Sequence, residues 1–156
     1  MNLVCIVGHT TSYLFGQHSD NMYNDIIHHV RRKSMDFSES ISSGRWIVSS
    51  YSEKHVTINQ VNYTNGIIIY PDYIDDKSEI KNISDLTDHH CQKMLKEPCE
   101  TIFIGTGLMT TIPDDSVIQP LYQANVGFEF MSTLAAIRLL MITTTEKRLC
   151  TFCLIF

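Results

Sequence analysis

The sequence contains no apolar run that approaches the roughly 18 residues needed to cross a lipid bilayer. It also has no excess of basic residues, because 12 lysines and arginines stand against 17 aspartates and glutamates, for a formal charge of −5. Non-specific binding of nucleic acid requires a basic surface, so the composition excludes that function class. We therefore expect no membrane span and no nucleic-acid partner.

The sequence also lacks any pattern of cysteines that indicates a disulfide framework. Its 5 cysteines are an odd number and are scattered through several segments, which favours reduced thiols in a cytosolic type of compartment. The first residues lack the basic region of a signal peptide, and acidic residues precede the first arginine, Arg31, which argues against an organellar transit peptide. We expect a cytoplasmic protein.

The composition of 44% apolar and 19% charged residues over 156 positions is typical of a globular chain that buries a core without disulfide bonds. Residues 1–34 differ from the rest, because they are rich in histidine and contain one helix candidate, from Asp20 to about Arg32. We expect residues 35–156 to form a single α/β domain. Residues 1–34 are interpreted as an N-terminal extension that is either disordered or not native to the fold, and both alternatives stay open.

The N-terminal half of this domain contains short β-branched and aromatic runs that are bounded by turn residues. Residues 46–51 and 55–59 predict two strands joined by a polar turn, and residues 66–70 predict a third strand that Pro71 stops. An Asn-Gly turn signal at 65–66 precedes this third strand. We expect these N-terminal strands to pair antiparallel.

The C-terminal half alternates helices and strands. Helices are expected over 87–97, from the Pro113 region to Asn125, and over 132–143, and strands over 101–104, 127–130 and 148–155. The start of the middle helix stays open, although Pro120 fits a first helical turn better than a later one. This order of elements indicates an α/β fold with largely parallel pairing of the C-terminal strands.

The run Thr101–Ile104 predicts a buried, central strand that ends abruptly at Gly105-Thr106-Gly107. Ligands of open α/β sheets lie outside the carboxyl ends of parallel strands, so this turn is the first place to look for a site. Its two glycines are half of a dinucleotide fingerprint, but Thr110 stands where the third glycine belongs and Pro113 intervenes before any helix. We interpret the segment as a tight turn below a pocket.

A second junction, Met131-Ser132-Thr133, joins a predicted strand to a predicted helix whose free N–H groups can hold an anion or a polar ligand. Helix capping by Ser132 or Thr133 explains these residues equally well. If the strands before the two turns are parallel neighbours, both turns lie at one edge of the sheet and can line one cleft. The candidate pocket residues are Gly105, Thr106, Gly107, Ser132, Thr133, Arg138 and Pro71.

This cleft offers hydroxyl groups and the cation Arg138, but no histidine or acid that is clearly aimed at it. Catalysis needs a nucleophile with a base or a pair of carboxylates, so this scarcity counts against an enzyme. Cys150 and Cys153 lie in an apolar strand, where residues three apart face opposite sides, so they do not predict a zinc or redox centre. The adjacent histidines at 89–90 fit a solvated helix face. We expect no metal and no cofactor.

From about residue 35 to 155 the chain carries a series of short motifs in a characteristic order. They are Ser50-Tyr51, Ile58-Asn59, Ile69-Tyr70-Pro71-Asp72, Asp85-Leu86-Thr87, Ile104-Gly105-Thr106-Gly107, Val126-Gly127-Phe128-Glu129-Phe130-Met131, Thr133, Ala135-Ala136, Arg138 and Glu146-Lys147-Arg148. With these motifs the chain resembles the small α/β domains related to the mitochondrial NADH:ubiquinone oxidoreductase (complex I) assembly factor 3. The chain departs from that family's pattern at Ser132, where aspartate is usual, and at 137–141, where Cys-Arg-Thr-Tyr-Asn is usual.

The resemblance implies a three-layer fold around a mixed central sheet, with no established catalytic activity. It also implies a protein partner, because the best-understood members are assembly factors that bind other proteins during maturation of a respiratory membrane complex. The corresponding compartment in a eukaryote is the mitochondrial matrix. We therefore expect a non-catalytic protein-interaction domain. The alternative is a small-molecule-binding protein or an enzyme that uses the cleft beside Gly105–Gly107 and Ser132–Thr133.

Overall fold

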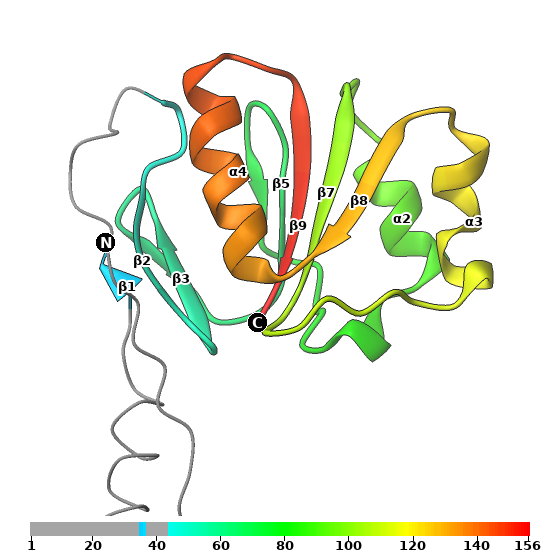
Figure 1. Ribbon diagram of the computed structural model, residues 1–156, viewed down its shortest axis with the longest axis horizontal. Coiled ribbons are helices and arrows are strands. Elements are labelled where there is room, and N and C mark those ends of the chain that lie inside the picture. Colours follow the sequence, from blue (N-terminus) through cyan, green and yellow to red (C-terminus); the bar gives the residue numbers. More distant parts are fainter. Residues whose placement is uncertain (1–34, 37–43) are drawn as a thin grey trace, which may run out of the picture. The chain divides into compact units, whose positions relative to one another are not determined.

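A computed structural model describes residues 35–36 and 44–156 of the chain, and the structural statements below concern those residues. The predicted helix within residues 1–34, and the interpretation of that segment as an extension, lie outside the described residues. The described part is built on two β-sheets and three α-helices (Figure 1).

The smaller sheet is antiparallel throughout and has the strand order β1-β2-β3-β4. Its strands are Met35–Asp36 (β1), Val48–Ser52 (β2), His55–Ile58 (β3) and Val61–Tyr63 (β4). The register pairs Ile58 with Val61, so only Asn59 and Gln60 form the turn between them, with φ of 49° and 68°. The antiparallel pairing of the first two predicted strands is confirmed, whereas the third, predicted over 66–70, lies in the larger sheet. A hairpin turn forms before the Asn-Gly signal at 65–66.

The larger sheet is mixed and has the strand order β6-β5-β9-β7-β8. Its strands are Ile67–Ile69 (β5), Ile74–Asp75 (β6), Thr101–Thr106 (β7), Gly127–Met131 (β8) and Cys150–Ile155 (β9). Strand β7 is parallel to both β8 and β9, whereas β5 is antiparallel to both β6 and β9. The middle position belongs to β9 and not, as expected, to β7, because the last strand of the chain inserts between β5 and β7.

Helices cover both faces of the larger sheet (Figure 1). Helix α4 (Thr133–Thr145) and the smaller sheet lie on one face, and α2 (Asp88–Met94) and α3 (Asp115–Gln123) lie on the other, with a short 3-10 helix, η1 (Ile83–Asp85), before α2. Cys150 belongs to the buried cluster on the α4 side and Cys153 to the cluster on the α2 side. The predicted three-layer α/β architecture is confirmed, and so is the opposite facing of the two cysteines.

Helix α3 begins at Asp115 and contains Pro120 in its interior, so the expectation that Pro120 lies in the first turn is wrong. A proline inside a helix removes one backbone hydrogen bond and costs about 3 kcal/mol. The helix also buries Ile118 and Leu121, each 1% exposed, and each such side chain stabilises the fold by about 2 kcal/mol. Burial on this face therefore outweighs the lost hydrogen bond. None of the helices that the structure describes is both long and apolar enough to cross a membrane.

Thr151 carries the first testable prediction, because its side chain is 0% exposed in β9 and its hydroxyl has no hydrogen-bond partner among the described residues. Burial of an unpaired hydroxyl costs about 1–3 kcal/mol. Thr151→Val removes the hydroxyl and nearly keeps the shape, so we expect the free energy of unfolding in urea to rise by about 1 kcal/mol. Thr151→Ser, which keeps the hydroxyl and loses a methyl group, should lower it. A less stable valine variant would contradict the prediction.

Candidate functional site

The turn Gly105-Thr106-Gly107 ends β7 beside the end of β9, because the register pairs Thr106 with Ile155. Gly105 has no space for a side chain, since a Cβ atom there would lie 2.8 Å from the Cα atom of Thr133. Gly107 has a φ of 102°, which L side chains rarely adopt. Backbone geometry therefore requires both glycines: the first lets α4 approach β7, and the second turns the chain.

Thr133 connects three elements at this edge of the sheet. Its Oγ1 atom accepts a hydrogen bond from the N–H of Gly107 at 2.8 Å and donates one to the carbonyl of Ile155. Its own N–H donates to the carbonyl of Gly107 at 2.8 Å. We call Gly107, Thr133 and Ile155 the threonine junction, because Thr133 joins the ends of β7 and β9 to the start of α4.

The neighbouring hydroxyl groups are also bonded to the backbone. Thr106 Oγ1 accepts from the N–H of Thr111 at 3.0 Å, and its hydroxyl hydrogen faces the carbonyls of Met109 and Met131 at 2.9 and 3.1 Å. Ser132 is the N-cap of α4, where its Oγ accepts from the N–H of Ala135 at 3.4 Å. The hydroxyls of Thr106 and Ser132 therefore bond to the protein's own backbone, which favours a structural role over ligand binding.

A hollow of about 260 Å³ opens at the carboxyl ends of β7 and β9, and we call it the β7–β9 hollow. Its lining includes Tyr51, Glu53, Asn82, Thr106, Gly107 and Phe156. Of the predicted pocket residues, only Thr106 and Gly107 line this hollow. Gly105 and Thr133 are buried, Ser132 is half-buried, and Arg138 is exposed on α4.

The side chains of the β7–β9 hollow offer hydrogen bonds more readily than acid–base chemistry. Burial, followed by the charge of Glu53, raises the pKa of Tyr51 above its usual value. Tyr51 is therefore protonated at neutral pH and can donate a hydrogen bond, but it cannot act as a base. Glu53 is the sole side chain with a carboxylate among the described residues of its lining, so these side chains do not supply a carboxylate pair.

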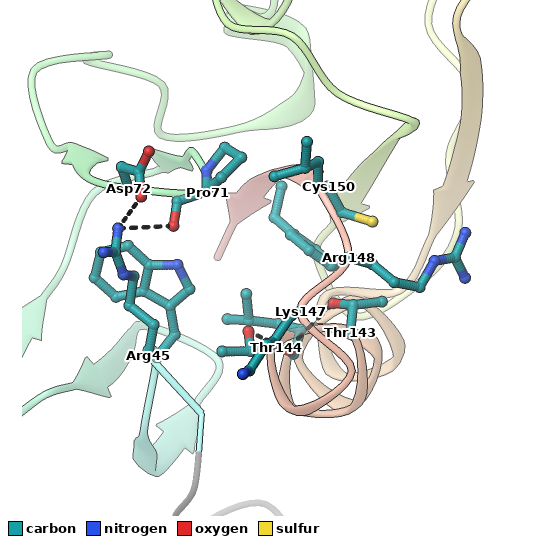
Figure 2. A pocket seen from close by; sticks show the side chains of 12 residues that line it. Arg45, Pro71, Asp72, Thr143, Thr144, Lys147, Arg148 and Cys150 are labelled. Carbon is teal, nitrogen blue, oxygen red and sulfur yellow. Dashed lines mark hydrogen bonds and ion pairs between the residues drawn. The ribbon is translucent and has the colours of Figure 1, made fainter.

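A larger hollow, of about 360 Å³, lies where α4 ends and β9 begins, and we call it the α4–β9 hollow (Figure 2). It is lined by Pro71, the last of the predicted pocket residues, together with Arg45, Asp72 and Lys147. Apart from Pro71, the residues of this hollow are not among those predicted from the sequence. A signal existed in the basic pair that follows α4, Lys147 and Arg148, but nothing in the sequence links that pair to the distant Arg45.

The histidines and cysteines of the described part do not gather into a metal site, since it contains no group of three or more His, Cys, Asp or Glu side chains that could hold an ion. His90 has a structural role, because its Nδ1 lies 3.1 Å from the Thr87 nitrogen and its Nε2 lies 3.0 Å from the carbonyl oxygen of Ser78. His89 is exposed and Cys91 is buried, as the helical pattern predicted, but His90 is half-buried and does not lie on a solvated face as expected.

Solved structures define the class of protein to which this fold belongs. A Bordetella pertussis protein whose structure was determined in solution is described as a Mth938-like domain; it is 20% identical, with a TM-score of 0.60 over 80% of this chain and 91% of its own. A Bordetella parapertussis protein with a crystal structure is 24% identical, and the match has a TM-score of 0.65. It covers 73% of this chain and 98% of the Bordetella parapertussis chain. A Bartonella henselae protein whose crystal structure is described as that of an outer membrane protein is 21% identical, with a TM-score of 0.55. The match covers 72% of this chain and 95% of the Bartonella henselae chain. The chain thus has a Mth938-like fold.

The sequence profile of the DUF498/DUF598 proteins of unknown function matches residues 48–155. The chain belongs to this family, whose matched region runs from β2 to the end of β9. No curated protein matches the chain.

Removal of the Thr133 hydroxyl tests the threonine junction. Thr133→Val leaves the N–H of Gly107 and the carbonyl of Ile155 without this partner, so we expect the free energy of unfolding in urea to fall by about 3 kcal/mol. Thr143→Val is the matched control on the same helix. The Thr143 hydroxyl donates within its own helix, to the carbonyls of Leu139 and Leu140, and its removal should cost less than about 1 kcal/mol. Equal losses in the two variants would contradict the role assigned to Thr133.

Proposed function

We propose that this protein is a non-catalytic protein-interaction domain that acts as an assembly factor for a respiratory membrane complex. Two lines of support carry the proposal. One is the resemblance of residues 35–155 to the complex I assembly factor 3 domains. The other is an exposed apolar loop that lies beside an open edge of the larger sheet.

The loop after β7 exposes large apolar side chains, with Leu108, Met109 and Ile112 exposed by 63%, 76% and 68%. We call residues 108–112 the apolar loop. Single exposed apolar residues are ordinary on protein surfaces, but several in one short loop are typical of a surface that binds another protein. The base of the loop is held in place, because the N–H of Thr111 donates to Thr106 Oγ1 at 3.0 Å.

Strand β8 provides the second part of this surface, because it is the last strand in the order of the larger sheet (Figure 1). An edge strand presents backbone N–H and C=O groups that a partner strand can pair with. Gly127 and Glu129 are exposed on it. Tyr122 of α3 is 61% exposed and packs edge-on against Phe128 of β8, with ring centres 5.1 Å apart. An apolar surface next to a free strand edge favours a protein partner.

The hydroxyl groups of the two turns support a non-catalytic role for the same edge of the sheet. Thr106 and Thr133 both hold backbone groups of the fold, which leaves them poorly suited to act as nucleophiles. The protonated Tyr51 supplies no base in the adjoining hollow. These observations favour binding over chemistry.

The alternative function, binding of a small molecule, is favoured by one observation. The β7–β9 hollow lies at the carboxyl ends of parallel strands, which is where ligands of open α/β sheets bind. The Tyr51 hydroxyl lines this hollow and can orient a polar, uncharged ligand. In this alternative the apolar loop closes over the ligand and meets no protein partner.

Site-specific photocrosslinking in cells of the source organism distinguishes the two functions. With p-benzoylphenylalanine in place of Met109, we expect one discrete protein adduct, identified by mass spectrometry as a subunit of a respiratory membrane complex. The matched control is the same probe at Lys54, an exposed residue in the turn between β2 and β3, which should give no such adduct.

Two results would contradict the assembly proposal. One is the same set of adducts from positions 109 and 54, which would show that the apolar loop makes only unspecific contacts. The other is no adduct at position 109 together with a metabolite that stays bound to the purified protein and shifts the resonances of the β7–β9 hollow. That second result would establish the small-molecule alternative.

A further inference from the structure

The α4–β9 hollow is lined by four separate segments: residues 45–46, the turn between β5 and β6, the end of α4, and the start of β9. Gly44 contacts α4 so closely that a Cβ atom on it would lie 2.7 Å from Thr144 Cγ2. This contact fixes the neighbouring Arg45 and Trp46 at the wall of the hollow. The volume of about 360 Å³ falls in the range of known small-molecule sites.

Arg45 is the first of two cations that line this hollow. Its Nη1 atom donates to the carbonyl of Pro71 at 3.2 Å and forms an ion pair with the carboxylate of Asp72 (Figure 2). These bonds orient the guanidinium and use only one of its nitrogens. The Nε and Nη2 donors have no bonding partner among the described residues, so they can bind an added anion.

Lys147 is the second cation, and the end of α4 holds it in an unusual conformation. The N–H groups of Lys147 and Arg148 donate to the carbonyls of Thr144 and Thr143 at 3.3 and 3.0 Å, which closes the helix. Lys147 has a φ of 58° at a position where glycine or asparagine is the usual residue. Figure 2 shows its side chain extending toward the side of the hollow where Arg45 lies.

Arg148 is occupied elsewhere. Figure 2 shows its guanidinium pointing away from the hollow, and its Nη2 pairs with Glu100 at 3.2 Å. The carboxylate of Asp72 is the one acidic group among the described residues that line the hollow, and it is already paired with Arg45. The charge that faces the hollow is therefore positive by about one unit, which favours an anion.

The rest of the wall suits an apolar group. The half-buried Trp46 and the exposed Leu149 contribute apolar surface, and the buried Leu140 and Phe152 lie beneath it. The hydroxyls of Thr143 and Thr144, which also line the hollow, donate to carbonyls of their own helix and need no water partner. Burial raises the pKa of the Cys150 thiol, so it is not a ready nucleophile and the hollow is suited to binding.

From this arrangement we propose that the α4–β9 hollow binds a small organic anion, a carboxylate with an aromatic or branched apolar body. Lys147 and Arg45 bind the carboxylate, and the apolar body packs on Trp46 and Leu149 above the buried Leu140 and Phe152. Recognition needs both parts of the ligand, since a simple anion leaves the apolar wall uncovered and a neutral apolar molecule leaves the cations without a partner. This site is separate from the apolar loop and does not depend on the function proposed for it.

Trp46 makes the proposal directly measurable, because it is the 1 tryptophan of the chain and its indole N–H gives one resolved peak in a ¹H–¹⁵N spectrum. We expect 4-phenylbutyrate to shift this peak saturably, and its neutral counterpart 4-phenylbutanol to bind much more weakly. Lys147→Asn removes the charge and suits the left-handed backbone, and it should weaken phenylbutyrate binding about threefold. The matched control Lys54→Asn, on the turn between β2 and β3, should leave the affinity unchanged.

Three results would overturn the proposal: no saturable shift of the Trp46 peak, equal affinity for the acid and the alcohol, or equal affinities of the wild type and Lys147→Asn. The rest of the spectrum reports whether each variant is folded. Lys147→Arg, which keeps the charge, provides a second check, because it should bind phenylbutyrate about as well as the wild type.

Discussion

One buried hydroxyl, on Thr133, holds together the edge of the sheet on which this structure depends. It bonds to the end of β7 and to the end of β9, while the residue itself begins α4. The bonded residues are 26 and 22 positions apart in the sequence. Gly105 allows them to meet because it leaves no side chain between β7 and the helix. The Gly-Thr-Gly and Met-x-Thr motifs are therefore two halves of one structural contact.

This contact changes where function is to be sought. The hydroxyls of Thr106, Ser132 and Thr133, which were predicted to line a pocket, bond instead to the protein's own backbone. The surfaces available to other molecules therefore lie around these residues. The apolar loop continues from the Gly-Thr-Gly turn, and the α4–β9 hollow lies at the other end of β9. The threonine junction fixes both, because it sets the position of α4 and β9 relative to β7. The two proposed binding surfaces, one after β7 and one at the start of β9, then share one support.

The sequence predicted the helices and strands better than it predicted which of them lie next to one another in the fold. Period-two patterns placed Cys150 and Cys153 on opposite faces. The alternation of helices and strands predicted largely parallel pairing in the C-terminal half, and β7 is indeed parallel to β8 and β9. The central position of β9 was beyond such reasoning, because chain order does not give sheet order. The role of Thr133 was hidden because helix capping explains the residue equally well. The α4–β9 hollow was missed because Arg45 and Lys147 meet only after folding.

Hydrogen exchange of the Gly107 amide tests the central claim most directly, because this N–H is the donor that Thr133 Oγ1 accepts. If the two turns form one structural contact, this amide opens only when the fold opens, and it should exchange as slowly as the amides of the central strand β9. Leu108, 63% exposed in the adjoining loop, supplies the rapid reference. Exchange at Gly107 as fast as at Leu108 would contradict the account, since it would mean that the turn is free to meet a ligand.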